Sequence, residues 1–301
     1  MDIRKKKRVA PIVLFVYNRP WHTKQTIEAL QKNELAGESE LYIYSDAPKN
    51  EEAEEQVKEV RSYIHGIDGF KKVTIIEREK NWGLAASIID GVTKIADEYG
   101  RIIVLEDDLV TSPYFLRFMN DALEYYEDEK KVWHISGWNY PIDTKETNRV
   151  FLWRVMNCWG WATWADRWKF FEKDTEKLIR EFSKEAIKRF NLDGVENFWE
   201  QVLLNREGKI DTWAIYWYAT IFKQHGLCLN PVRTFVDNIG FDGSGVHCDE
   251  KSFVDNIQTE YSIQFTKEIE ETKVYTDEIK KHLQKGVLTR IKRLVLKWKW
   301  F

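Results

Sequence analysis

Three adjacent carboxylates, Glu106–Asp108, directly follow the apolar run Ile102–Leu105. Such a run predicts a strand buried on both faces of a parallel sheet, which places the carboxylates in the turn that leaves it. Ser112 and Pro113 predict the N-cap and first residue of the next helix, so this turn is short. Adjacent carboxylates repel one another unless a cation or a donor-rich ligand neutralises them. Their oxygens suit Mg²⁺ or Mn²⁺ bound together with substrate phosphates, and the strand context favours this interpretation over a solvated acidic turn.

Two other carboxylates are candidates for a general base. Asp211 precedes an apolar helical pattern, so it could simply cap that helix. Its alternative role is to take the proton of an acceptor hydroxyl during a displacement reaction. Glu200 lies in the aromatic segment Phe-Trp-Glu-Gln and is the second candidate.

The glycine-rich segment 240–247 ends in His247, and Cys248 follows it. Its glycines permit a mobile loop that could close over a diphosphate and exclude water. His247 is a candidate second metal ligand or phosphate contact, although a lone histidine is more often neither. The ligand spacing of a structural zinc site is absent.

Tryptophans form the densest aromatic stretch of the chain at Trp159, Trp161, Trp164 and Trp168. The spacing of the last three predicts a helix face that packs into the core. Trp159 lies before that helix, where its ring could stack on the apolar face of a sugar or simply pack.

The elements that position these residues alternate between strands and helices in the first half of the chain. Apolar runs predict strands at 11–17, 41–45, 73–77, 102–105 and 132–136. Helical patterns begin at Pro20 and recur near 51–64, 84–98 and 113–127. This alternation predicts an α/β fold with a mainly parallel sheet flanked by helices. In the second half, residues 184–207 and 211–225 are expected to be helical.

Ligands of such sheets bind outside the carboxyl ends of the strands. Four polar loops lie there: 17–19, 45–46, 81–83 and 106–108. Any one loop could be polar only because the chain leaves the core at that point. Four together favour a binding site.

The segment Val104–Leu109, followed by Ser112–Leu116, resembles the metal-binding segment of glycosyltransferases with the GT-A fold. The resemblance is to the N-acetylglucosaminyltransferase I type and its bacterial relatives, in which Glu-Asp-Asp replaces the usual Asp-X-Asp. It implies that Asp108 is the principal ligand of Mn²⁺ or Mg²⁺. It also implies that Glu106 and Asp107 face the donor sugar and ribose.

Other segments extend the resemblance over roughly residues 10–250. Val-Tyr-Asn-Arg-Pro implies that Arg19 approaches the nucleotide, and Asp46 takes the position that hydrogen-bonds uracil. Asn81 begins a segment similar to the Asn-X-Gly beside the donor. Segments 159–164 and 238–247 also resemble the bacterial relatives. The family places its catalytic aspartate in a tryptophan-rich segment before a late helix, which favours Asp211 over Glu200.

The resemblance implies transfer of a sugar, with inversion, from a nucleoside diphosphate such as UDP. The acceptor would be a hydroxyl of a glycan or lipid-linked oligosaccharide in bacterial surface polysaccharide biosynthesis. A sugar-nucleotide pyrophosphorylase is one alternative, but the turn after the first strand reads Asn-Arg-Pro and not a glycine-rich phosphate loop. A catalytically dead glycan-binding protein is the other. Nucleotide release from a panel of sugar nucleotides discriminates all three.

Composition is that of a soluble globular protein, with 43% hydrophobic and 32% charged residues among 301. The pattern predicts one GT-A domain over residues 1–265 and a charged C-terminal tail over 266–301. A net charge of -3 gives no reason to expect nucleic acid as a partner. Three widely spaced cysteines fit a reducing compartment.

The chain is expected to be cytoplasmic. Basic residues 4–8 and the apolar run after them lack the cleavage site of a signal peptide. No segment approaches the roughly 20 apolar residues that span a membrane. The end of the tail, 287–301, mixes Lys and Arg with Leu and Trp, which favours a helix lying on the inner face of the cell membrane. A helix packed on the domain is the alternative.

Overall fold

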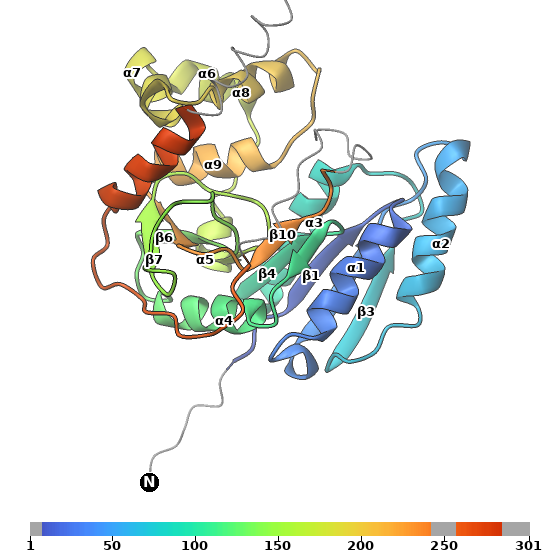
Figure 1. Cartoon of the computed structure of the whole chain (residues 1–301). Helices are drawn as coiled ribbons and strands as arrows, with labels where there is room; N and C mark the ends of the chain where they lie inside the picture. Colours follow the sequence, from blue (N-terminus) through green and yellow to red (C-terminus); the bar gives the residue numbers. More distant parts are fainter. Residues whose placement is uncertain (1–7, 242–256, 285–301) are drawn as a thin grey trace, which may run out of the picture.

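The computed structural model describes residues 8–241 and 257–284 (Figure 1). Its centre is an eight-stranded mixed sheet in the order β3-β2-β1-β4-β8-β6-β9-β7. The strands of this sheet are β1 (Ile12–Val16), β2 (Glu40–Ser45), β3 (Lys72–Glu77), β4 (Arg101–Glu106), β6 (Val132–Ser136), β7 (Val150–Trp153), β8 (Trp161–Trp164) and β9 (Leu227–Pro231). A separate antiparallel pair is formed by β5 (Leu109–Thr111) and β10 (Val236–Asn238).

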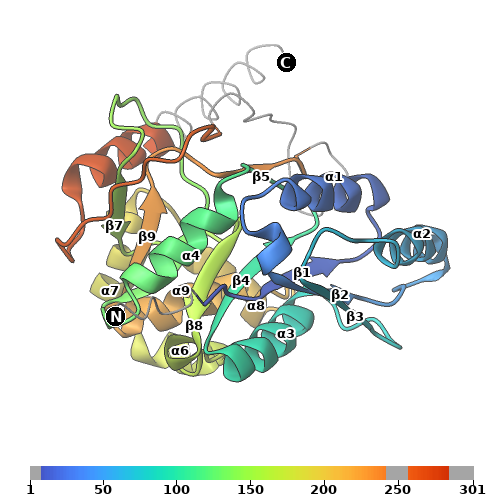
Figure 2. The same cartoon turned by 90° about the horizontal axis from the view of Figure 1, so that it is seen from below.

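Helices cover both faces of the sheet (Figure 2). They are α1 (Pro20–Gln31), α2 (Glu54–Ile64), α3 (Leu84–Tyr99), α4 (Phe115–Tyr125), α5 (Ala165–Trp168), α6 (Thr175–Glu181), α7 (Lys184–Phe190), α8 (Trp199–Arg206) and α9 (Ala214–Lys223). Short 3-10 turns occur at Ala36–Glu38, Glu51–Ala53 and Leu192–Gly194. The last described segment, 273–284, is also helical and buries Tyr275 and Ile279 in the core.

Two hydrophobic cores lie on opposite faces of the sheet, and β1 contributes to both. Val13 and Phe15 pack into the core with α3 and α9, whereas Ile12 and Leu14 pack into the core with α1, α2 and α4. This alternation explains why β1 is apolar throughout, because successive side chains of a strand point to opposite faces. Gly91 lets α3 approach closely, since a β-carbon there would lie 2.8 Å from the Phe15 ring.

The predicted α/β class and mainly parallel sheet are confirmed. β3, β2, β1 and β4 run parallel to one another, and β6 runs parallel to β9. β8 pairs antiparallel with β4 and β6, and β7 pairs antiparallel with β9. All five predicted strands and the predicted helices of the first half are present. Ser112 is not the helix cap that the sequence suggested, because α4 begins at Phe115 with Tyr114 at the N-cap position.

Three helix predictions in the second half need correction. Trp161–Trp164 is strand β8, so Trp161 and Trp164 point into opposite cores and do not share a helix face with Trp168. The predicted helix 184–207 is two helices, α7 and α8, separated at Leu192–Gly194. A break occurs there because Leu192 and Asp193 have positive φ angles of 53° and 62°. The helix predicted over 211–225 is confined to α9.

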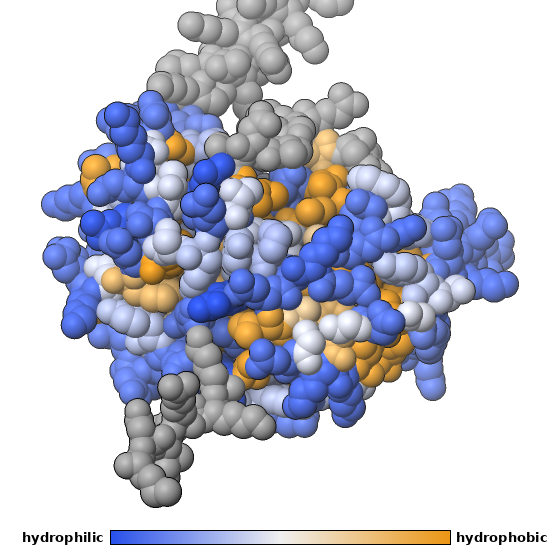
Figure 3. All heavy atoms as spheres, turned by 60° about the horizontal axis from the view of Figure 1, so that its bottom comes forward, coloured by the Kyte–Doolittle hydropathy of each residue, from blue (hydrophilic) through white to orange (hydrophobic). Residues whose placement is uncertain are grey.

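The surface is mainly hydrophilic, with apolar patches on the face seen in Figure 3. Among the described residues, no helix is long and apolar enough to cross a membrane. The basic end of the tail, 287–301, lies outside the described residues. The proposed domain division at residue 265 stays a prediction.

Candidate functional site

The acidic triplet forms the junction between β4 and β5. β4 ends at Glu106 and β5 begins at Leu109, so Asp107 and Asp108 make up the turn. Thr26 of α1 fixes this turn, because its hydroxyl donates to the Asp107 carbonyl oxygen at 2.8 Å and accepts from the Leu109 amide at 3.1 Å. The carboxylates are therefore held at the carboxyl end of a central strand, where ligands of such sheets bind.

Arg19 approaches the triplet from the loop after β1, which pairs in parallel with β4. Its Nη1 atom lies 2.9 Å from Oδ2 of Asp108 and 3.8 Å from Oδ1 of Asp107. The side chains of Arg19 and Asp108 are each 17% exposed, so this pair is only partly screened by water. Arg19 and Asp108, both predicted to belong to the binding site, are therefore in contact.

Among the described residues, Arg19 is the cation that pairs with the triplet. Burial raises the pKa of Glu106 to about 8 and that of Asp107 to about 7. The negative charge of Asp108 adds to both shifts, whereas Arg19 opposes them. Carboxylates clustered in this way are stabilised in their charged form by a bound cation, which lowers their pKa values.

The donor chemistry fits Mg²⁺ or Mn²⁺, which prefer carboxylate oxygens. However, within the described ranges no group of three or more His, Cys, Asp or Glu side chains is placed to hold a metal ion. The triplet therefore fits an ion bound by one or two carboxylates, with phosphate oxygens and water completing its shell. His247, the predicted second ligand, lies outside the described residues.

β10 and the residues that follow it lie beside the triplet. Asn238 pairs with Leu109, and the Ile239 amide donates to the Asp108 carbonyl oxygen at 2.9 Å. A β-carbon at Gly240 would clash with Oδ2 of Asp108. The sequence predicted a glycine-rich loop in this segment, and the structure shows that one of its glycines makes room for the carboxylate.

Asp46 and Asn81 join the loop after β2 to the start of α3. The Asp46 carboxylate accepts hydrogen bonds from the amides of Ala47 at 2.9 Å, Trp82 at 2.9 Å and Gly83 at 2.8 Å. Asn81 Nδ2 donates to the Ala47 carbonyl oxygen at 2.7 Å. Both oxygens of Asp46 thus hold protein backbone, and its contact with a base stays a prediction.

Sequence reasoning missed Arg78 at this edge. Its guanidinium carbon lies 3.9 Å from the centroid of the Trp82 ring, and the same group pairs with Asp90. Trp82 is 38% exposed, so its ring forms part of the surface beside Asp46. The only sequence signal was the position of Arg78 directly after the strand 73–77.

The two candidate bases are not joined to the triplet by a hydrogen bond or ion pair among the described residues. Asp211 is 71% exposed and pairs with Lys173. Glu200 accepts a hydrogen bond from Asn197 at 3.1 Å on exposed α8. Asp211 nevertheless stands two residues before Trp213, whose ring stacks on Trp161 with a centroid distance of 5.1 Å.

That stacking joins the segment of Asp211 to β8, which pairs with β4. Trp161 pairs with Val104 of β4, two residues before Glu106. Before β8, the Trp159 ring contacts Phe241 at 5.3 Å between centroids, next to Gly240. Burial raises the pKa of the Cys158 thiol, and the charges of Glu106 and Asp108 add to the shift. The segment before β8 therefore borders the triplet. No sequence pattern predicted that Cys158 lies beside it.

Cys158 and Cys228 are free thiols among the described residues, and Cys248 lies outside them.

The chain matches one family profile and resembles a number of solved structures, of which two are described. The sequence profile described as Glycosyl transferase family 2 matches residues 12–182, more than half of the chain. No curated protein matches. The mannosyltransferase PcManGT from Pyrobaculum calidifontis, solved with GDP-Man and Mn²⁺, is 11% identical over 74% of this chain and 73% of that chain, with a TM-score of 0.41. TarS of S. aureus is 13% identical over 46% of this chain and 24% of that chain, with a TM-score of 0.30.

Proposed function

The chain belongs to glycosyl transferase family 2, and we propose that it transfers a sugar from a nucleoside diphosphate, UDP, to a hydroxyl of an acceptor glycan. The observation that carries this proposal is the meeting of Arg19 with the triplet at the carboxyl ends of β1 and β4. A cationic group beside clustered carboxylates suits a site that holds a diphosphate together with a metal ion. The family match favours a transferase over the pyrophosphorylase and over a dead glycan-binding protein. The finer assignment to the N-acetylglucosaminyltransferase I type belongs to this proposal.

Each residue of the site has a role in this proposal. Asp108 holds Mn²⁺ or Mg²⁺, which neutralises the diphosphate when it is bound. Glu106 and Asp107 face the donor sugar and ribose, and Arg19 binds the phosphates as a second cation. Asp46 and Asn81 shape the loop that receives the base, with Asp46 as the proposed partner of uracil.

The acceptor hydroxyl needs a base to take its proton during an inverting displacement. We assign this role to Asp211, with Glu200 as the second candidate. The stacking of Trp213 on Trp161 supports Asp211, because Trp161 belongs to the strand beside β4. His247 remains a proposed second metal ligand or phosphate contact.

Nucleotide release is the direct test of this function. The chain is incubated with UDP-, GDP- and CDP-sugars, with Mn²⁺ or Mg²⁺ and with glycan acceptors, and the released nucleotide is measured. We expect metal-dependent release of UDP that rises with acceptor concentration. Absence of release from every donor would contradict the proposal.

We further propose that residues 287–301 attach the enzyme to the inner face of the cell membrane, where a lipid-linked acceptor of surface polysaccharide assembly would be available. The support is the mixture of basic and apolar residues in that segment. A basic residue near an anionic surface contributes about 1 kcal/mol. A chain ending at residue 284 should bind nucleotide normally but lose co-sedimentation with anionic vesicles. If the full chain ignores such vesicles at low salt, the tail has another role.

A further inference from the structure

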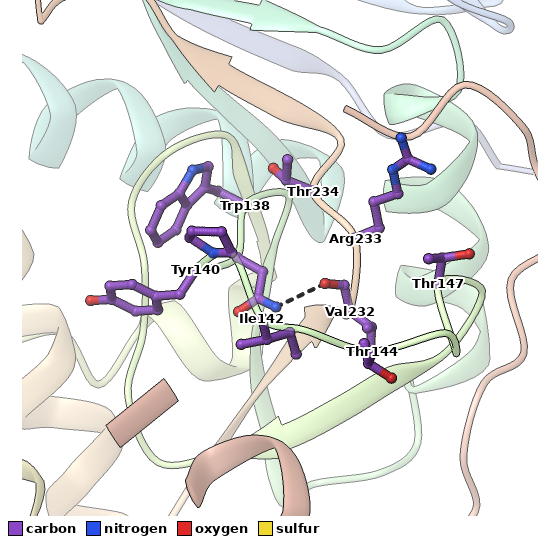
Figure 4. A pocket seen from close by; sticks show the side chains of 10 residues that line it. Trp138, Tyr140, Ile142, Thr144, Thr147, Val232, Arg233 and Thr234 are labelled. Carbon is purple, nitrogen blue, oxygen red and sulfur yellow. Dashed lines mark hydrogen bonds between the residues drawn. The ribbon is translucent and has the colours of Figure 1, made fainter. Parts of the chain in front are cut away.

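A pocket of about 190 Å³ opens between the segment after β6 and the segment that joins β9 to β10 (Figure 4). Trp138, Tyr140 and Ile142 line it on the first segment, and Val232 and Arg233 line it on the second. The hydroxyl-bearing residues Thr144 and Thr147 complete the lining from the loop before β7. None of these residues has a role in the site described above.

The pocket lies at the same edge of the sheet as the acidic triplet. β4 and β6 both pair antiparallel with β8, so they run in the same direction, and β9 runs parallel to β6. The residues that follow β6 and β9 therefore emerge at the edge where the triplet follows β4. Ligands of α/β sheets bind at this edge.

Both walls of the pocket lead to the triplet. The second wall continues through β10 to Gly240, which lies against Asp108. Thr234 and Gly240 are six residues apart, so this path spans at most about 22 Å. On the first wall, the Trp138 ring lies 4.5 Å from that of Trp159, which contacts Phe241 beside Gly240. The pocket is thus connected to the site through the rings of Trp159 and Phe241.

The lining combines aromatic and aliphatic surface with threonine hydroxyls and one charged residue, Arg233. Trp138 and Tyr140 form an edge-to-face pair with centroids 4.7 Å apart. Asn139 is only 3% exposed, and its Nδ2 donates to the Val232 carbonyl oxygen at 3.0 Å. Its Oδ1 atom has no hydrogen-bond partner among the described residues. Asn139 thus fixes the base of the pocket by holding the two segments together.

We propose that this pocket binds a neutral sugar ring of the acceptor glycan, beyond the sugar that receives the transferred residue. A sugar ring offers apolar C–H faces to the half-buried Tyr140 and Ile142 and hydroxyl groups to Thr144 and Thr147. This inference rests on the proposed glycosyltransferase function and adds that the enzyme prefers an acceptor of at least two sugars.

The test uses the full chain with Thr144→Val and Thr147→Val combined, which removes two hydroxyls and keeps the side-chain shape. The matched control is Thr74→Val, on β3 at the opposite side of the sheet. Binding of mono-, di- and trisaccharide methyl glycosides with gluco, galacto and manno configurations is measured by ligand-observed NMR without donor. We expect the double variant to bind its preferred di- or trisaccharide about tenfold more weakly, and monosaccharides unchanged.

Several outcomes would overturn the inference. They are failure of the wild-type chain to bind any of these glycosides, equal loss for mono- and trisaccharides, and no loss at all. A charged acceptor that is lost in Arg233→Gln but kept in the threonine double variant would also overturn the neutral class. Nucleotide release from sugar nucleotides is measured separately, so a failure of the proposed function is distinguished from a failure of this pocket assignment.

Discussion

Nη1 of Arg19 lies 2.9 Å from Oδ2 of Asp108, although the two residues are 89 positions apart in the chain. They meet because β1 and β4 are parallel neighbours, so the loops that follow them leave the sheet side by side. Pro20 at the first position of α1 limits how far Arg19 can move away from that edge. Among the described residues, Arg19 is the cation that pairs with both Asp107 and Asp108.

Asp108→Asn should uncouple metal from nucleotide. The amide keeps the shape of the carboxylate but loses the negative oxygen that Mn²⁺ prefers. We expect Mn²⁺ to lose its effect on UDP affinity, measured by calorimetric titration, and turnover to fall by at least about 100-fold. Asp128→Asn, on an exposed loop, is the control and should behave as the wild type. Metal-dependent turnover that survives in Asp108→Asn would refute the ligand assignment.

Gly240→Ala tests the close approach of β10 to the triplet. The added β-carbon would clash with Oδ2 of Asp108, so either the carboxylate or the loop must shift. A displacement of about 1 Å in a catalytic site can reduce the rate by about 100-fold, and we expect kcat/KM to fall by roughly 10- to 100-fold. At Gly37 an added β-carbon would meet nothing nearer than 4.0 Å, so Gly37→Ala is the control. Equal kcat/KM in both variants would show that Asp108 tolerates the shift.

The sequence predicted that Arg19 lies beside Asp108, but it did not predict the contact of Gly240 with Asp108. The runs 11–17 and 102–105 predicted β1 and β4, and the rule that ligands bind at carboxyl ends then placed Arg19 beside the triplet. The contact of Gly240 with Asp108 depends on the pairing of β10 with β5, which no local pattern specifies. The stretch Trp161–Trp168 was misread because a strand followed by a helical turn can give the same i, i+3, i+7 spacing. The Trp82 amide donates a hydrogen bond to Asp46, which lies 36 positions earlier, so no local sequence pattern specifies this contact either.

His134 makes the stability of the fold depend on pH. Burial lowers the pKa of this side chain to about 3, and its Nδ1 accepts a hydrogen bond from Trp217 Nε1 at 3.2 Å. Nε2 therefore carries the proton that is donated to the Asn157 carbonyl oxygen at 2.9 Å. The unfolded chain binds a proton at pH values below about 6.5, where the folded chain does not.

The free energy of unfolding should therefore fall as the pH decreases from about 6.5 towards 3, by up to about 1.4 kcal/mol per pH unit from this group. Urea unfolding at pH 7.5 and pH 5.0 measures this loss. His134→Gln can keep both hydrogen bonds without titrating, so its loss over this interval should be smaller. His65→Gln, at an exposed site, is the control. A pH dependence that is the same in His134→Gln and the wild type would contradict this assignment.

The last prediction separates the two candidate bases. Asp211→Asn keeps the size of the side chain but cannot accept a proton at neutral pH, and loss of a base typically costs about 10²- to 10⁴-fold in rate. UDP binding should be unchanged, because no hydrogen bond or ion pair among the described residues joins Asp211 to the triplet. The effect should therefore appear in kcat with acceptor present and not in nucleotide affinity.

Glu200→Gln is the matched comparison, since it removes the other carboxylate from an exposed position of α8. Lys173→Met is a further control, because it removes the ion-pair partner of Asp211 and leaves the carboxylate in place. If Asp211 is the base, Lys173→Met should retain most of the activity that Asp211→Asn loses. Normal turnover of Asp211→Asn together with an inactive Glu200→Gln would assign the base to Glu200, because only the carboxylate that takes the acceptor proton is needed for the transfer step.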